Sequence, residues 1–113
     1  MLRRGEFRRV YEQGRRRSAS LCTVFVRPNG LPQSRFGVTA SARVGKAVVR
    51  NRLKRRLREV FRRHRANLPG GWDVVVNPRE TVAKVSFRTL EGEVLRLFPS
   101  QPPDGISEEW RRK

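Results

Sequence analysis

The stretch that decides the fold is residues 46–65, KAVVRNRLKRRLREVFRRHR. Ten of these twenty residues are Lys or Arg, and Glu59 is the only acidic one. The apolar residues keep the spacing of one helix face, and we expect that face to be buried in a core. This stripe comprises Val49, Leu53, Leu57, Val60 and His64, with Phe61 beside it. The other faces present guanidinium groups, which repel one another unless a polyanion such as nucleic acid neutralises them.

The overall charge points the same way. The chain has 113 residues, a formal net charge of +17 and a pI near 11.9. This length suits one small domain with a single modest core. So basic a domain favours nucleic acid or an anionic membrane as its partner, and argues against an ordinary small-molecule enzyme.

Targeting and redox signals are absent from the sequence. No apolar run approaches the roughly 20 residues that a bilayer span needs. The N-terminal MLRRGEFRRVY has no apolar segment of the kind found in secretory signals, so we expect a cytoplasmic protein. Cys22 is the only cysteine, which excludes a disulfide framework and a cysteine metal site. We expect it to be a small buried strand residue.

Around the basic helix, the pattern predicts two further helices and three strands. A short helix is expected at residues 5–13, with Phe7, Val10 and Tyr11 on one face and Gly14 after it. The alternating and apolar runs predict strands at residues 20–27, 35–41 and 72–76, and the last helix at residues 81–98. No element is assigned to the basic run 15–17. The first two strands are expected to pair as a hairpin.

This order, α-β-β-α-β-α, predicts an α+β fold with one sheet and helices against one face. The basic helix lies between the second and third strands, which favours a parallel βαβ crossover, normally a right-handed one. Residues 1–98 are expected to form the domain. Residues 99–113 are rich in proline and charge, and we expect them to form a flexible C-terminal tail.

Several segments resemble one known family. The run 50–58, RNRLKRRLR, resembles the RNR signature of the bacterial ribonuclease P protein subunit. Residues 35–49, RFGVTASARVGKAVV, and 73–76, DVVV, are similar to the strands that flank this signature, and residues 7–14, FRRVYEQG, are similar to the first helix. The resemblance covers about residues 2–98. Its combination of motifs is specific, whereas a bare RNR tripeptide would not be.

The resemblance implies a fold and a function. The fold is a small α/β sandwich of the ribosomal protein S5 domain 2-like type, with one mixed sheet and a left-handed βαβ crossover, contrary to the general rule. The function is that of a protein subunit that binds the ribonuclease P RNA and the 5′ leader of precursor tRNA. The RNA subunit would cleave the leader with Mg²⁺ held mainly by RNA. The protein would need no cofactor, act as one copy per RNA and be inactive alone.

The basic helix is the predicted surface for the RNA subunit. On a helical wheel centred on Leu53, the cations occupy three sides. The planar fork of arginine binds phosphate bidentately, and Asn51 adds an amide that could contact a base or cap a turn. A merely solvated helix usually mixes charges of both signs, unlike this one. The predicted residues are Lys46, Arg50, Asn51, Arg52, Lys54, Arg55, Arg58 and Arg62.

A second surface is aromatic and cationic. Single-stranded RNA is held by base stacking on aromatic rings along a positive groove. By residue type alone, Phe7, Tyr11 and Phe25 are more often core residues, whereas the resemblance assigns them to the leader-binding cleft. Arg27 and Arg43 are expected to contact phosphate beside them. The family usually has two basic residues where this chain has Ala42 and Arg43, and the segment before Phe7 is short, so we expect a weaker affinity for the leader.

Nothing in the sequence predicts catalysis by the protein alone. His64 is the only histidine and has no carboxylate or nucleophile at a useful spacing, so we expect it to be structural. No phosphate-binding loop, Ser/His/Asp set or zinc-ligand spacing occurs. A structural RNA-binding protein of the ribosome would share this size, charge and fold class, and an aromatic cleft would distinguish the two. A duplex-DNA binder is disfavoured because no helix-turn-helix pair precedes the basic helix.

Overall fold

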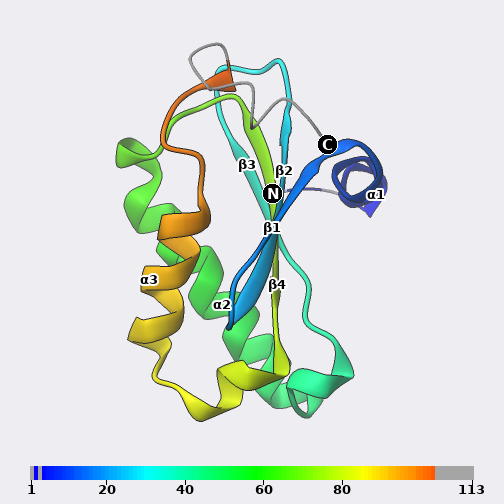
Figure 1. Cartoon of the computed structure of the whole chain (residues 1–113), viewed down its shortest axis with the longest axis vertical. Helices are drawn as coiled ribbons and strands as arrows, with labels where there is room; N and C mark the ends of the chain where they lie inside the picture. The colour runs from blue at the N-terminus through cyan, green and yellow to red at the C-terminus, as the bar shows by residue number, and fades with distance from the viewer. Residues whose placement is uncertain (1, 3, 104–113) are drawn as a thin grey trace.

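The computed structural model describes residue 2 and residues 4–103, so most of the expected tail, residues 104–113, lies outside the described part. A four-stranded sheet separates α1 on one face from α2 and α3 on the other (Figure 1). In chain order the elements are α1 (Arg4–Gln13), β1 (Arg15–Ser18), β2 (Cys22–Pro28), β3 (Arg35–Val38), η1 (Ala42–Val44), α2 (Ala47–His64), η2 (Arg65–Asn67), β4 (Trp72–Pro78), η3 (Glu80–Lys84) and α3 (Phe87–Leu97), where η marks a short 3-10 helix.

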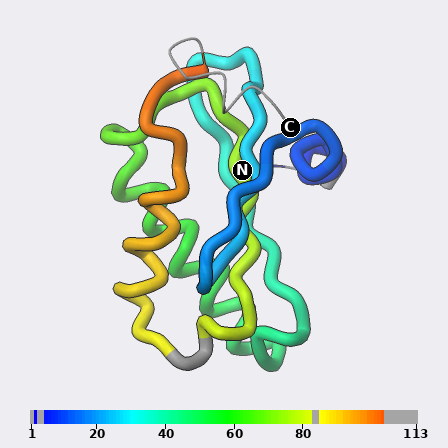
Figure 2. Tube along the Cα trace, in the orientation of Figure 1, coloured from blue at the N-terminus to red at the C-terminus, as the bar shows by residue number. Residues whose placement is uncertain are grey.

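The strands lie in the order β1-β2-β4-β3. The pairs β1/β2 and β2/β4 are antiparallel, and β3/β4 is parallel. The predicted α+β class and the parallel crossover through α2 are confirmed. The predicted hairpin between the strands at 20–27 and 35–41 is wrong, because β4 inserts between β2 and β3 (Figure 2). Val74, Val75 and Val76 of β4 are fully buried, as expected for a central strand covered on both faces.

The prediction that the helices lie against one face is also wrong. Successive strand residues point to opposite faces, so apolar β4 offers a surface on each side. Val74 and Val76 belong to the core beneath α2 and α3. Val75 packs instead with Val10 of α1 and with Leu2.

The basic run 15–17 forms the edge strand β1, which the sequence analysis missed. Arg15 pairs with Val26, and Ser18 pairs with Thr23. The strand has no apolar residue and therefore no alternating pattern. Charged residues on an edge strand also discourage further strand pairing.

The first two helices match the predicted positions to within about a residue. After α1, a Cβ atom at Gly14 would overlap the carbonyl oxygen of Val10, so this chain reversal requires glycine. The third helix begins later than residue 81. Residues Glu80–Lys84 form η3, and Ser86 then caps α3 by accepting a hydrogen bond from the Thr89 backbone N–H.

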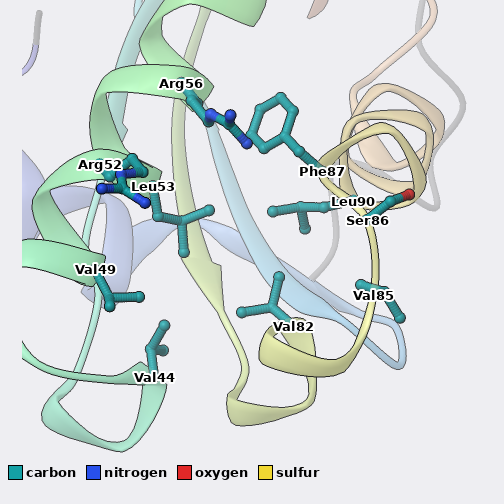
Figure 3. A pocket seen from close by; sticks show the side chains of 10 residues that line it. All are labelled: Val44, Val49, Arg52, Leu53, Arg56, Val82, Val85, Ser86, Phe87 and Leu90. Carbon is teal, nitrogen blue, oxygen red and sulfur yellow. The ribbon is translucent and has the colours of Figure 1, made fainter.

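The buried stripe of α2 matches the predicted one in the second half of the helix and departs from it near the start. Leu57, Val60 and Phe61 are buried, and the Phe61 ring stacks on Phe36 with centroids 4.2 Å apart. Val49, which was expected to be buried, is 46% exposed. The first turns of α2 face η1 and η3 across a cavity, rather than lying closely on the sheet (Figure 3).

Two further features complete the core. Cys22 is fully buried on β2, as predicted. Trp72 is also fully buried, and its indole N–H donates a hydrogen bond to the Gln101 carbonyl oxygen at 2.9 Å, so the start of the predicted tail contacts the domain. None of the described helices combines the length and apolarity needed to cross a bilayer.

Candidate nucleic-acid interface

The outer face of α2 carries an open groove lined by cations. Its lining residues come from one helix and are Val48, Asn51, Arg52, Lys54, Arg55 and Arg58. We call this surface the basic groove. Lys46 and Arg62 are exposed on the flanks of the groove, whereas Arg50 is only half exposed and its Nε is buried without a hydrogen-bond partner. The geometry therefore places most of the predicted RNA-subunit residues on one accessible surface.

The electrostatics of α2 are almost entirely unbalanced along its own sequence. Glu59 is its one acidic residue, and its carboxylate lies 3.5 Å from Arg62 in an exposed pair. Such a pair contributes about 0–1 kcal/mol. Arg63 pairs with Glu91 of α3 at 3.4 Å, whereas the cations that line the basic groove can make charge-assisted hydrogen bonds to phosphate.

The basic surface continues toward the edge of the sheet. A hollow of about 410 Å³ between α2 and β3 is lined by Arg35, Arg58, Arg62 and Arg65 together with Gln33. Arg65 donates a hydrogen bond to the Gln33 side-chain oxygen at 2.8 Å. Arg65 is the last residue of the predicted basic stretch, but only the structure brings it near Arg35, thirty residues earlier in the chain.

On the opposite face of the sheet, three aromatic rings meet beneath α1. Phe7 and Phe25 are half-buried and pack against the small core of Leu2, Val10 and Val75. Tyr11 is 38% exposed, and its ring meets Phe25 edge-on with centroids 4.8 Å apart. The rings are therefore compatible with a core role and with a role in a binding cleft, because they cover a small core and also keep accessible surface.

A glycine in the sheet lets α1 approach this closely. A Cβ atom at Gly37 would overlap the Phe7 ring, so no larger residue fits on β3 at this point. The absence of a side chain at Gly37 therefore allows the short distance between α1 and the sheet.

Polar groups lie next to the rings. The Tyr11 hydroxyl is 2.9 Å from Thr39 Oγ1 and 3.5 Å from Asn77 Oδ1, and Thr39 is hydrogen-bonded to Asn77. We call the site formed by these three residues with Phe7 and Phe25 the aromatic cleft. Thr39 and Asn77 were missed by the sequence analysis, since Thr39 follows β3 and Asn77 lies near the end of β4, two strands that are distant in sequence and parallel in the fold.

The two cations predicted for this cleft have different positions. Arg27 donates a hydrogen bond to the Gln13 side-chain oxygen at 2.9 Å, which places it at the end of α1. Arg43 is exposed in η1, which packs against η3 and α2. The Arg27 side chain therefore lies against the end of α1, whereas Arg43 belongs to η1, which packs against η3 and α2 instead.

Ion pairs hold α1 onto the sheet. Arg35 donates to both carboxylate oxygens of the buried Asp73, from Nε at 2.8 Å and from a terminal nitrogen at 2.7 Å, and also pairs with Glu6 of α1. Asn29 donates a further hydrogen bond to Asp73 at 3.0 Å. The hydrogen bonds to Asp73 raise the pKa of the Arg35 guanidinium above its ordinary value. No motif in the sequence indicated this link.

The groups that could serve acid–base or nucleophilic chemistry are engaged elsewhere. Buried Glu93 accepts hydrogen bonds from the Leu21 backbone N–H at 2.9 Å, from Ser20 at 3.1 Å and from the Cys22 thiol at 3.4 Å. Burial, helped by Glu93, raises the pKa of Cys22 to about 12, so this thiol is not a nucleophile at neutral pH. His64 Nε2 lies 3.6 Å from Glu91. Within residues 2 and 4–103, no three His, Cys, Asp or Glu side chains gather as metal ligands.

Comparison with known proteins identifies the family. Residues 1–100 match the family described as Ribonuclease P. The chain belongs to this family. The ribonuclease P protein component of Caldanaerobacter subterraneus is 40% identical over 97 residues, covering 86% of this chain and 84% of its own. That of Desulfovibrio desulfuricans is 50% identical over 100 residues, covering 85% and 77%.

Solved structures agree. The RNase P protein from Thermotoga maritima superposes with a TM-score of 0.81 at 38% identity, covering 87% of this chain and 96% of its own. The Staphylococcus aureus RNase P protein, at 23% identity, shares the fold with a TM-score of 0.77, covering 86% and 89%. The chain is thus a protein subunit of the ribonuclease P ribonucleoprotein, an endoribonuclease of tRNA processing, and ribonuclease P RNA is its partner. The relatives named here favour this function over the ribosomal alternative.

Proposed function

We propose that the basic groove of α2 binds the ribonuclease P RNA and that the aromatic cleft binds the 5′ leader of precursor tRNA. One observation carries the proposal: two surfaces of different chemistry lie on opposite sides of the same sheet. Both RNAs can therefore be bound at once.

The basic groove suits a folded RNA. Its cations project from one rigid helix, so they present a fixed row of phosphate-binding groups. Phosphate contacts dominate affinity and position the protein, without requiring a particular sequence. Asn51 adds an amide within the same groove.

The aromatic cleft suits a single strand. Bases of unpaired RNA stack on aromatic rings, and their edges are read by hydrogen bonds. Tyr11 and Phe25 offer accessible ring surface, while Thr39 and Asn77 offer donors and acceptors beside them. Arg27 of β2, whose side chain is hydrogen-bonded to Gln13 at the end of α1, would contact a leader phosphate.

The chemistry is assigned to the RNA subunit. Glu93, Cys22 and His64 make the contacts within the protein described above, and we propose that Mg²⁺ is held mainly by RNA. The protein then acts by holding substrate and RNA together, as one copy per RNA, in the cytoplasm.

Reconstitution tests this proposal. The protein is combined with a ribonuclease P RNA and precursor tRNA, and cleavage is measured over a series of magnesium concentrations. We expect no cleavage by the protein alone and a lower magnesium requirement for the RNA when the protein is present. Site-specific cleavage by RNA-free protein that survives repurification would contradict the assignment. Recovery of ribosomal RNA instead of ribonuclease P RNA with the purified protein would favour the ribosomal alternative.

A further inference from the structure

An apolar cavity of about 160 Å³ lies where α2, η1, η3 and the start of α3 meet (Figure 3). We call it the α3 cavity, and neither surface of the proposed function includes it. Its side chains come from four elements and several point toward a common space. The apolar lining residues are Val44, Val49, Leu53, Val82, Val85, Phe87 and Leu90, and the polar ones are Arg52, Arg56 and Ser86.

The cavity opens to solvent through apolar side chains. Val49 is 46% exposed and Val85 is 37% exposed, and they are two of the five large hydrophobic residues exposed within residues 2 and 4–103. Covering such surface is favourable because apolar area leaves water. Binding a ligand with an apolar face in this cavity is therefore expected to be favourable.

Two arginines that line the cavity indicate what charge such a ligand carries. Arg52 lines both the α3 cavity and the basic groove, so the two sites are adjacent. The Arg56 guanidinium also lines the cavity and lies 5.2 Å from the centroid of the Phe87 ring (Figure 3). A matching ligand has a flat apolar part that enters and an anionic part that stays outside.

The size of the cavity limits the flat part. An apolar cavity of about 150 Å³ accommodates benzene, whereas pockets for drug-sized ligands measure about 300–1,000 Å³. The α3 cavity thus has room for about one aromatic ring. A nucleotide fits this description, since its base is a flat ring system and its phosphate is an anion.

We infer that the α3 cavity receives one unstacked base of the ribonuclease P RNA while Arg52 and Arg56 bind the neighbouring phosphates. This inference rests on the proposed binding of that RNA to α2. Unpaired bases are the part of RNA that proteins stack on aromatic rings and on guanidinium planes, and Phe87 and Arg56 supply both. The Ser86 hydroxyl accepts a hydrogen bond from the Thr89 backbone N–H at 3.3 Å, so it is committed to capping α3. The base is therefore held by shape and stacking, and the cavity is expected to discriminate only weakly among the four bases.

Filling the cavity is the first test. Val49→Phe adds a ring into the space from an exposed helical position, whereas Val49→Ala leaves the space open. We expect Val49→Phe to weaken binding of the RNA subunit on the order of tenfold, the scale of one lost base stack. The salt dependence should not change, because the phosphate contacts remain. Val49→Ala should bind nearly as the parent does. Leu31→Phe, at an exposed position in the β2–β3 connection, is the control for added bulk.

Site-directed crosslinking is the second test and does not depend on affinity. Val85→Cys is labelled with a photoactivatable aryl azide; the native Cys22 is fully buried and stays unlabelled. At saturating protein, we expect the label to crosslink to one unpaired nucleotide of the RNA. Adding Val49→Phe should abolish that crosslink. Leu31→Cys with the same label should give none.

The outcomes separate the inference from the proposed function. Parent-like binding by Val49→Phe, or Val85 crosslinks spread over paired nucleotides, overturns the inference. If Arg55→Ala and Arg58→Ala weaken binding in that case, the basic groove still binds RNA and only the cavity is wrong. If neither arginine variant changes affinity or salt dependence, α2 is not the RNA-binding element and both proposals fail.

Discussion

The basic groove and the aromatic cleft are built in opposite ways. Every side chain of the groove projects from one helix, and most are exposed. The cleft draws Phe7, Tyr11, Phe25, Thr39 and Asn77 from separate parts of the chain, and its rings are partly buried. A long-range, salt-sensitive attraction needs only a charged helix, whereas stacking at short range needs distant segments to be folded together. The cleft should therefore depend on fold stability, and the groove on ionic strength.

The largest expected effect removes the buried carboxylate that holds Arg35, the residue that links α1 to the sheet. Asp73→Ala leaves Arg35 without its buried carboxylate partner, and hydrogen bonds to charged groups contribute about 1.5–3 kcal/mol each. We expect the free energy of unfolding to fall by about 3 kcal/mol, measured by urea denaturation. Glu12→Ala is the matched control on the same helix, because it removes the exposed pair with Arg8. That change should cost less than about 1 kcal/mol. Equal losses in the two variants would show that Asp73 does not anchor α1.

The next effect separates leader binding from the other contacts. Phe7→Ala, Tyr11→Ala or Phe25→Ala should weaken binding of precursor tRNA by about 1–3 kcal/mol for each lost base stack. Affinity for mature tRNA and for the RNA subunit should hardly change, since neither involves the leader. Thermal unfolding is measured beside binding, because truncating a fully buried aromatic costs about 3–5 kcal/mol of stability. If Phe7→Ala and Tyr11→Ala both melt the protein and weaken every ligand equally, the rings are core residues only.

A smaller effect is expected at the groove. With roughly 5–8 phosphates engaged, the slope of log K against log salt should be on the order of −4 to −7 for the RNA subunit. Arg55→Ala and Arg58→Ala should each weaken binding by up to about 1 kcal/mol, and each should flatten the slope by about 0.7–0.9. The double variant should combine the two changes. An unchanged slope in that variant would show that phosphate binds elsewhere.

The smallest effect at neutral pH concerns Cys22, which lies outside both surfaces. Its ionisation is expected to change the free energy of unfolding only at alkaline pH. Its pKa is raised from 9.0 to about 12, so the unfolded chain loses this proton before the folded chain does. The contribution to stability is therefore complete below about pH 9 and is lost as pH rises toward 12. The slope is at most about 1.4 kcal/mol per pH unit. Comparing parent and Cys22→Ala by denaturation at several pH values isolates it. A parallel pH dependence of the two proteins would contradict the assignment.

The groove could be predicted because its information is local. Arginines at successive helical positions define their own surface, whatever the helix packs against. The exposure of the first turn was less accessible to prediction, since Val49 has the spacing of a core residue but lines the α3 cavity and is exposed. Whether such a residue is covered depends on η3 and α3, about thirty residues later.

The cleft and the sheet required information from distant parts of the chain. Residue types alone favoured a core role for Phe7, and only the family resemblance assigned it to RNA. Strand β1 has no apolar residue and is formed by backbone pairing with β2. Backbone pairing alone produces no recognisable sequence pattern. The wrong hairpin has the same cause, because no local rule places β4 between two strands that precede it.

The central position of β4 also bears on how the chain is made. Cys22 pairs with Pro78 across 56 residues, and among the strands of the described residues β3 pairs only with β4. Contacts so distant in sequence slow folding, because the loop between them must close first. On the ribosome, all of α2 is synthesised before the strand that joins β2 to β3. Three strands and the basic helix α2 therefore emerge before the strand that completes the sheet, and the aromatic cleft is completed only after Asn77 has emerged.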